Sequence, residues 1–484
     1  MLLECFEKIG NNVIVRALRS FLHSVWYIVF VALLMVCSNV FSLEVPVFFA
    51  FLVLGLLVVL FDDDLKGVIP VCCCAYMSTS YANNPSFNVG SSVFYDPAFK
   101  LQLIFIIVVA VIALGGRLIT LIVNGEKKKK MPRLTIGFLA LGAALVLGGL
   151  FSSYYDLRTA FFGFVILASL CGLYFLFYYG VKWKETKIDY FAYLFMIIGL
   201  ALFFEIIGIY VLSDFFKPDA LYYHDRAALQ TGWGMYNNIG CVLAMSIPAA
   251  LYLAATKKHG WAYMIASLFL AFELVISQSR NSMLFGGCIY GVGLIIALVK
   301  SSKRERIFNL IVLGVALALV CAGVIVLAVV FREKMNGFFS SMMKLGFFSD
   351  NSRFNLYRDG LVQFTEEPFL GIGFYQCKAF RWGNLSENAF LPPRYHNTVL
   401  QMLISCGVFG LVCYLFHRFQ TVWMLFRRPT MEKTFIALCI SGLLLTSLVE
   451  CHFFSFGPGM LYAVLLACAE GSDIKRKEDT SAAK

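Results

Sequence analysis

The sequence predicts an all-α polytopic membrane protein with about 14 transmembrane helices, or about 12 if the weakest segments do not cross. Three observations support this fold class. Of the 484 residues, 60% are hydrophobic and only 14% are charged, whereas soluble domains carry about a quarter charged residues. Apolar runs of about 20 residues, the length that crosses a bilayer, follow one another along the chain. Short basic segments separate them, as expected of cytoplasmic loops.

Each predicted span is an apolar run bounded by polar or charged residues. The third is short and ends in Ser78, Thr79 and Ser80, so a re-entrant segment is the alternative there. No soluble stretch between the runs is long enough for a separate nucleotide-binding domain. The predicted spans are 24–41, 45–61, 67–80, 100–123, 134–150, 160–180, 188–211, 234–255, 261–278, 281–299, 307–331, 396–417, 434–449 and 452–470.

The distribution of positive charge orients these spans. With the N-terminus inside, most of the 40 lysines and arginines fall in inner loops, and both termini are predicted to be cytoplasmic. The net charge of +11 is therefore interpreted as topogenic, and no nucleic acid is expected as a partner. Two outer segments exceed turn length, 213–233 and 332–395, and long loops in compact proteins are usually functional.

Positive charges on the outer face need a reason other than topology. Several of them are arginines, whose planar fork matches phosphate oxygens and stays charged in poorly hydrated places. The set indicates an anionic, phosphate-bearing ligand, although for any single member the alternative is a solvated loop charge or a headgroup contact. The outer arginines are Arg226, Arg280, Arg332, Arg353, Arg358, Arg381 and Arg394.

Two acidic residues, Glu205 and Glu273, lie within apolar spans, where ionisable side chains are functional candidates. Glu273 and Arg280 are seven residues apart, which places them two helical turns apart on one face, so we expect them to line one outer cavity. The alternative is that each acid pairs with a neighbouring polar group that makes its burial tolerable.

The second long loop contains a predicted amphipathic helix over 353–364. It places Arg353 near a helix N-terminus, where the helix dipole favours an anion. His396 then opens the twelfth span at its outer end. Histidine exchanges a proton near neutral pH, so it is a candidate general base, with a structural role as the alternative. Asn397 follows it and is grouped with the candidate substrate-binding residues.

The order of these segments resembles the signature region of the O-antigen ligase and O-antigen polymerase superfamily. The resemblance covers about 226–411, and one departure is Asn281, where the family commonly has Gly. The matching elements are Arg226 with Gly232 and Asn237-Asn238, Ser279-Arg280-Asn281, Asn351-Ser352-Arg353, Pro368-Phe369-Leu370-Gly371-Ile372-Gly373, His396-Asn397-Thr398-Val399-Leu400 and Gly407-Val408-Phe409-Gly410-Leu411.

The resemblance implies a C-type glycosyltransferase-like helical bundle in the bacterial cytoplasmic membrane. Such an enzyme uses an undecaprenyl-diphosphate-linked glycan on the outer face and passes it to an acceptor glycan or glycolipid, for cell-surface polysaccharide biosynthesis. Polymerase and ligase both remain open, because they differ in the acceptor. The implied parts are N-terminal transmembrane helices in 1–225, a catalytic region in 226–411 with the extracytoplasmic loop 332–395, C-terminal transmembrane helices in 412–470, and a cytoplasmic tail in 471–484.

The expected mechanism follows from the resemblance and from side-chain chemistry together. Arg280 and Arg353 would grip the diphosphate, and His396 would accept the proton of the attacking sugar hydroxyl. Arginines then take the place of a divalent metal, so neither a metal nor a cofactor is expected. A lipid-linked glycan flippase or another secondary transporter is the alternative, although transporters usually place ionisable groups near the membrane midplane in repeated halves. The expected substrate-binding residues are Arg226, Arg358, Glu273 and Asn397.

Overall fold

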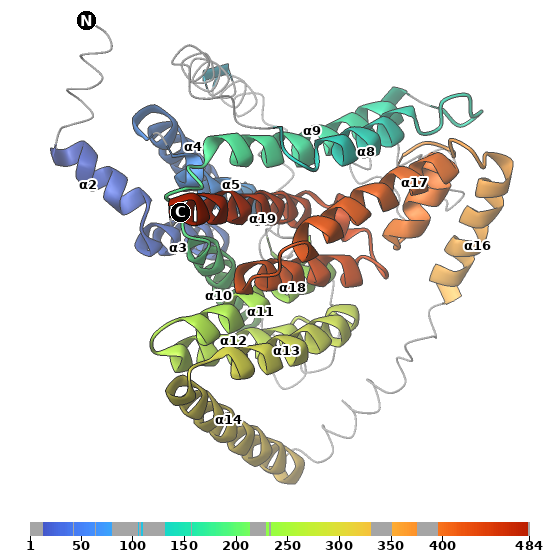
Figure 1. Ribbon diagram of the computed structural model, residues 1–484. Coiled ribbons are helices and arrows are strands. Elements are labelled where there is room, and N and C mark those ends of the chain that lie inside the picture. The colour runs from blue at the N-terminus through green and yellow to red at the C-terminus, as the bar shows by residue number, and fades with distance from the viewer. Residues whose placement is uncertain are drawn as a thin grey trace, which may run out of the picture.

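The computed structural model describes residues 13–41, 43–62, 64–79, 105, 108–109, 131–155, 157–212, 229–231, 234–330, 351–374 and 395–482. These residues form an almost entirely helical bundle (Figure 1), which confirms the all-α fold class. The exceptions in the described parts are two short 3-10 turns and a hairpin of two-residue antiparallel strands, β1 (Gln230–Thr231) and β2 (Gly234–Met235), directly before α11.

A helix is present at each predicted span except 100–123, most of which lies outside the described residues. The elements up to the hairpin are α2 (Val13–Leu22), α3 (Val25–Phe41), α4 (Glu44–Phe61), η1 (Leu65–Gly67), α5 (Val68–Thr79), α8 (Thr135–Leu147), α9 (Leu157–Gly180) and α10 (Asp189–Leu212). Those after it are α11 (Tyr236–Thr256), α12 (Gly260–Ile276), α13 (Arg280–Lys300), α14 (Lys303–Val330), α16 (Asn351–Glu366), α17 (Thr398–Phe426), α18 (Met431–Thr446), η3 (His452–Phe454) and α19 (Phe456–Ala482).

Six helices in the described part of the chain are long and apolar enough to cross a membrane. A seventh is added if α2 and α3, which are bent by 69° at their junction, form one broken span. Four further apolar helices are shorter. These lengths support a multi-pass membrane protein, but they do not confirm a count of about 14 spans. The six are α9, α10, α11, α13, α14 and α17.

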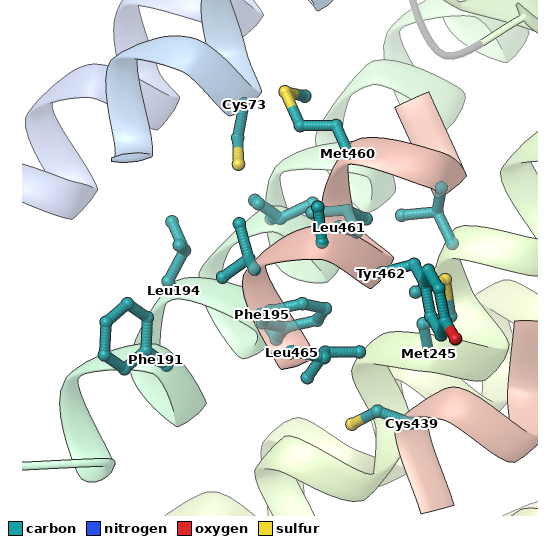
Figure 2. Packing of buried hydrophobic residues seen from close by; sticks show 14 of the residues in the cluster. Cys73, Phe191, Leu194, Phe195, Met245, Cys439, Met460, Leu461, Tyr462 and Leu465 are labelled. Carbon is teal, nitrogen blue, oxygen red and sulfur yellow. The ribbon is translucent and has the colours of Figure 1, made fainter. Parts of the chain in front are cut away.

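Helix α11 lies at the centre of the bundle. Its residues from Ile239 to Ala254 are buried, and it packs against α10, α12, α13 and α18. Figure 2 shows Met245 of α11 in one buried apolar cluster with side chains from other helices, among them Phe195 of α10 and Leu465 of α19. Cys73 and Cys439 fill the same apolar core, as expected of small polarisable side chains.

Helix α17 is broken at Gly407, whose φ of 66° and ψ of −166° are accessible essentially only to glycine. The segment 368–373 is hydrogen-bonded to the backbone on both sides of this break. Pro368 and Phe369 accept hydrogen bonds from the N–H groups of Val408 and Phe409, and the N–H of Ile372 donates to Ile404. These contacts satisfy backbone groups that the break removes from the helix. The predicted span over 396–417 therefore consists of two helical pieces.

Replacing Gly407 by alanine is expected to destabilise the protein by about 3 kcal/mol or more. An alanine Cβ would lie 2.1 Å from the carbonyl oxygen of Phe369, and the backbone conformation itself disfavours any side chain. The matched control is Gly172→Ala in α9, where nothing lies within 4 Å of the added carbon. Thermal unfolding of the detergent-purified variants measures the difference, and equal melting temperatures would contradict the break at Gly407.

Candidate functional site

A carboxylate in the connection between α18 and η3 joins three other elements. Glu450 Oε2 lies 2.6 Å from His396 Nδ1, and Oε1 accepts hydrogen bonds from Arg353 Nη2 at 3.0 Å and from Asn237 Nδ2 at 2.9 Å. The side chain of Glu450 is only 10% exposed, whereas that of His396 is 41% exposed. We call Glu450, His396, Arg353 and Asn237 the Glu450 cluster.

Helix α16 brings Arg353 to this cluster and confirms the loop helix predicted from the sequence. The helix is held against the first piece of α17 by a small apolar cluster of Ile372, Tyr395 and Ile404, with Leu356 and Phe364 of α16 packed at its edge. This packing leaves the N-terminal end of α16 beside Glu450. Arg353 also donates to the carbonyl of Val449 at 3.1 Å, so its guanidinium is held by the backbone as well as by the carboxylate.

His396 directly precedes α17 and is held in a left-handed backbone conformation, with φ of 49°. Such a conformation is uncommon outside glycine and is tolerated by histidine and asparagine more than by most residues. The hydroxyl of Tyr357 in α16 donates to the carbonyl of His396 at 3.3 Å. From this position the imidazole contacts Glu450.

The charges around Glu450 keep it ionised. Burial alone would raise the pKa of this carboxyl group, but the hydrogen bond with His396 and the charges of His396, His452 and Arg353 outweigh burial and lower the pKa to about 2. Glu450 is therefore a carboxylate at any pH at which the protein works. As a carboxylate it can only accept hydrogen bonds.

Four helices begin at the Glu450 cluster. Asn237 is the second residue of α11, and Arg353 is the third residue of α16. Thr398 is the first residue of α17, and its hydroxyl donates a hydrogen bond to the carbonyl of Glu450 at 3.3 Å. The start of α13 joins them, because Ser279 Oγ donates to Asn237 Oδ1 at 3.1 Å and Asn281 Nδ2 donates to the carbonyl of Thr446 at 2.8 Å. Helix N-termini carry partial positive charge, so this region favours an anion.

Arg280 is the first residue of α13, between the two residues that connect that helix to the cluster. Ser279 makes no side-chain cap at this helix start. The structure thus brings Arg280, Arg353 and His396, the three predicted catalytic residues, to one end of the bundle. Arg353 and His396 are joined through Glu450.

Other predicted site residues lie elsewhere. Arg358 is on a different face of α16 from Arg353, with a side chain that is 74% exposed and 3.7 Å from Asp359. The remaining outer arginines lie outside the described residues: Arg226, Arg332, Arg381 and Arg394.

The expectation that Glu273 and Arg280 share one helix face is wrong. Helix α12 ends at Ile276 and α13 begins at Arg280, so a bend separates the two residues. Glu273 is fully buried, and neither of its carboxylate oxygens has a hydrogen-bond partner among the described residues. Glu273 therefore lies in the interior of the bundle rather than beside Arg280 on one helix face.

Asn397, predicted as a substrate-binding residue, lies directly before the start of α17. Its side-chain oxygen caps α17 by accepting from the N–H groups of Val399 and Leu400, and its amide nitrogen donates to the carbonyl of Leu448 at 2.8 Å. Both ends of the amide are thus used by the backbone. The residue ties the start of α17 to the connection that carries Glu450.

Sequence reasoning missed Glu450 and did not assign a site role to Asn237. The sequence signal for Glu450 was an acidic residue at the outer end of a predicted span, in Glu450-Cys451-His452. Glu450 and Asn237 are both far from Arg353 and His396 in the sequence, so no local pattern connects them. His452 is bonded to the residue next to Asn237, because its Nδ1 lies 2.8 Å from Asn238 Oδ1. In the parts of the chain that the structure describes, no three His, Cys, Asp or Glu side chains gather as a set of metal ligands.

The fold and this site define a multi-pass helical membrane protein with an arginine- and histidine-lined region that favours an anion. Residues 265–415 match the protein family described as O-Antigen ligase. The match runs from α12 into α17, includes Arg280, Arg353 and His396, and supports the O-antigen ligase and polymerase superfamily. Asn237 and Glu450 lie outside the matched segment. No curated protein matches the chain.

Proposed function

We propose that this protein is a membrane glycosyltransferase that transfers or polymerises polyprenyl-diphosphate-linked oligosaccharide on the outer face of the cytoplasmic membrane. The observation that supports this most directly is the meeting of Arg353 and His396 on one carboxylate, at a place where four helices begin. Anion binding and proton transfer, the two requirements of such a reaction, have candidate residues at one end of the bundle.

The reaction proposed for this site is a single displacement. The acceptor hydroxyl oxygen forms a bond with the anomeric carbon while the bond from that carbon to the diphosphate oxygen breaks. The hydroxyl proton moves to His396, and the bonding electrons leave with the polyprenyl diphosphate. Arg280, Arg353 and the nearby helix N-termini stabilise the charge that develops on this leaving group. Displacement in one step inverts the anomeric centre.

The proposal needs no divalent metal, because two guanidinium groups supply the positive charge that a metal supplies in other transferases. Arg226 and Arg358 remain candidates for contacts with the glycan, whereas the placement of Glu273 and Asn397 favours structural roles for those two residues. We propose about 14 spans and cytoplasmic termini, with the catalytic region in 226–411. The opposite, cytoplasmic ends of α13 and α17 then carry Lys300 and Arg427.

A transfer assay in detergent micelles separates this function from the transporter alternative. Purified protein is mixed with polyprenyl-diphosphate-linked oligosaccharide, with and without a lipid A-core or glycan acceptor, and each mixture is assayed with and without chelator. We expect a longer lipid-linked glycan or a glycosylated acceptor, without any nucleotide sugar. A flippase gives neither product, because moving a lipid-linked glycan across a membrane forms no glycosidic bond. Loss of transfer on adding chelator would contradict the metal-free mechanism.

A further inference from the structure

Glu450 belongs to none of the sequence motifs described above, although it lies at the centre of the Glu450 cluster. We propose that Glu450 is a positioning residue that keeps the proton of neutral His396 on Nδ1, so that Nε2 is the basic nitrogen offered to the acceptor hydroxyl. This inference rests on the proposed transferase function. It adds to that function a residue that orients the base and stabilises its charged form.

The first step of the argument is the tautomer. A carboxylate only accepts hydrogen bonds, so a contact of 2.6 Å between Glu450 Oε2 and His396 Nδ1 requires the proton on Nδ1. In a neutral imidazole the other nitrogen then carries the lone pair. With 41% of the His396 side chain exposed and only 10% of Glu450, the ring has its buried side on the carboxylate and an accessible side for substrate.

The second step is that Glu450 is fixed from several elements. Its other oxygen accepts from Arg353 of α16 and Asn237 of α11, and its carbonyl accepts from the hydroxyl of Thr398. Asn237 is itself held by Ser279 at the start of α13. A carboxylate with this many partners has little freedom to rotate, so the direction in which it holds the imidazole is set by the fold.

The third step is electrostatic. When His396 accepts the hydroxyl proton it becomes an imidazolium, and the neighbouring positive charges of Arg353 and, if protonated, His452 disfavour that state. Glu450 is the acid in direct contact with the ring, and its negative charge offsets theirs. The elements packed around this site also carry Arg280 at the start of α13, the paired Arg358 and Asp359 of α16, and the hydroxyl groups of Tyr357 and Tyr395.

The test compares Glu450→Gln with wild type in single-turnover transfer between pH 5 and 9, together with donor binding. We expect turnover to fall about 100-fold, because the amide can also donate to Nδ1 and select the wrong tautomer. The pH of half-maximal activity should move down, since the imidazolium loses its neighbouring negative charge. Donor affinity should not fall, because removing an anion leaves the arginines with more positive potential for the diphosphate.

A purely structural carboxylate would give a different pattern, in which the amount of folded protein falls but the pH profile of the remaining activity does not move. Glu470→Gln is the matched control, since Glu470 is also buried and hydrogen-bonded, to the N–H of Arg133 at the other end of the bundle. We expect wild-type turnover and an unchanged pH profile for this control. Unchanged turnover in Glu450→Gln overturns the inference while leaving the transferase function intact, whereas an inactive wild type overturns the function itself.

A second measurement does not depend on the folding of a variant. In wild-type protein labelled with nitrogen-15 histidine, the His396 signals are assigned by their absence in His396→Gln. In the neutral ring we expect Nδ1 to show the chemical shift of a protonated nitrogen and Nε2 that of an unprotonated one. The opposite tautomer would exclude the proposed role of Glu450.

Discussion

Replacing His396 by glutamine is expected to lower the single-turnover rate of glycan transfer by about 100-fold or more, the usual scale for the loss of a general base. Glutamine keeps a hydrogen-bonding group next to Glu450 but cannot carry a proton away from the acceptor hydroxyl. Donor affinity should remain close to that of wild type, because the arginines that bind the diphosphate are unchanged. In wild type, transfer should increase with pH as the imidazole loses its proton.

Because His396 has an unusual backbone conformation, a second substitution is needed to separate loss of the base from backbone strain. With φ at 49°, glutamine introduces some backbone strain as well as removing the base. Asparagine adopts this conformation more readily, so His396→Asn removes the base with less strain. Equal losses in both variants indicate proton transfer, whereas near wild-type turnover in His396→Asn would leave only a backbone role. His259→Gln is the control at an exposed histidine that also has a positive φ, 61°.

Arg280→Ala and Arg353→Ala are each expected to reduce transfer by about 100- to 1000-fold, the range seen when one charge-stabilising donor is removed from an active site. In both cases donor binding should weaken together with turnover, because the diphosphate is contacted before and during the reaction. Lysine should restore little activity, since a point charge cannot replace the two parallel hydrogen bonds of a guanidinium group. Donor binding and single-turnover transfer measure these effects.

The structure adds a distinction between the two arginines. Arg353 also pairs with Glu450, so its removal leaves that carboxylate with one partner fewer and should affect the pH profile as well as donor binding. Arg427→Ala is the control, because this exposed arginine lies at the opposite end of α17. Arg358→Ala should have a smaller effect than Arg353→Ala, since its side chain is 74% exposed. Full activity of both Arg280→Ala and Arg353→Ala at normal expression would reduce them to ordinary loop charges.

Hydropathy and charge were sufficient to predict the helical fold class and where most helices lie. The cost of burying backbone polar groups in lipid forces apolar runs of this length into helices, so local composition predicts them without knowledge of neighbours. The same reasoning selected Arg280, Arg353 and His396, because a positive or titratable group on the outer face needs a reason other than topology. The loop helix that carries Arg353 was also predictable, from a local amphipathic pattern.

Contacts between distant segments were decided only by the tertiary structure. Glu450 meets Asn237, Arg353 and His396 because four helix starts pack together, and no local pattern reports such packing. The break at Gly407 depends on the segment 368–373 offering hydrogen bonds to the opened backbone. The bend before Arg280 separates it from Glu273, which helical spacing alone had placed on the same face. Local sequence determines which segments become helices, but the hydrogen bonds and ion pairs between segments determine which side chains form the site, because their geometry depends on the whole packed bundle.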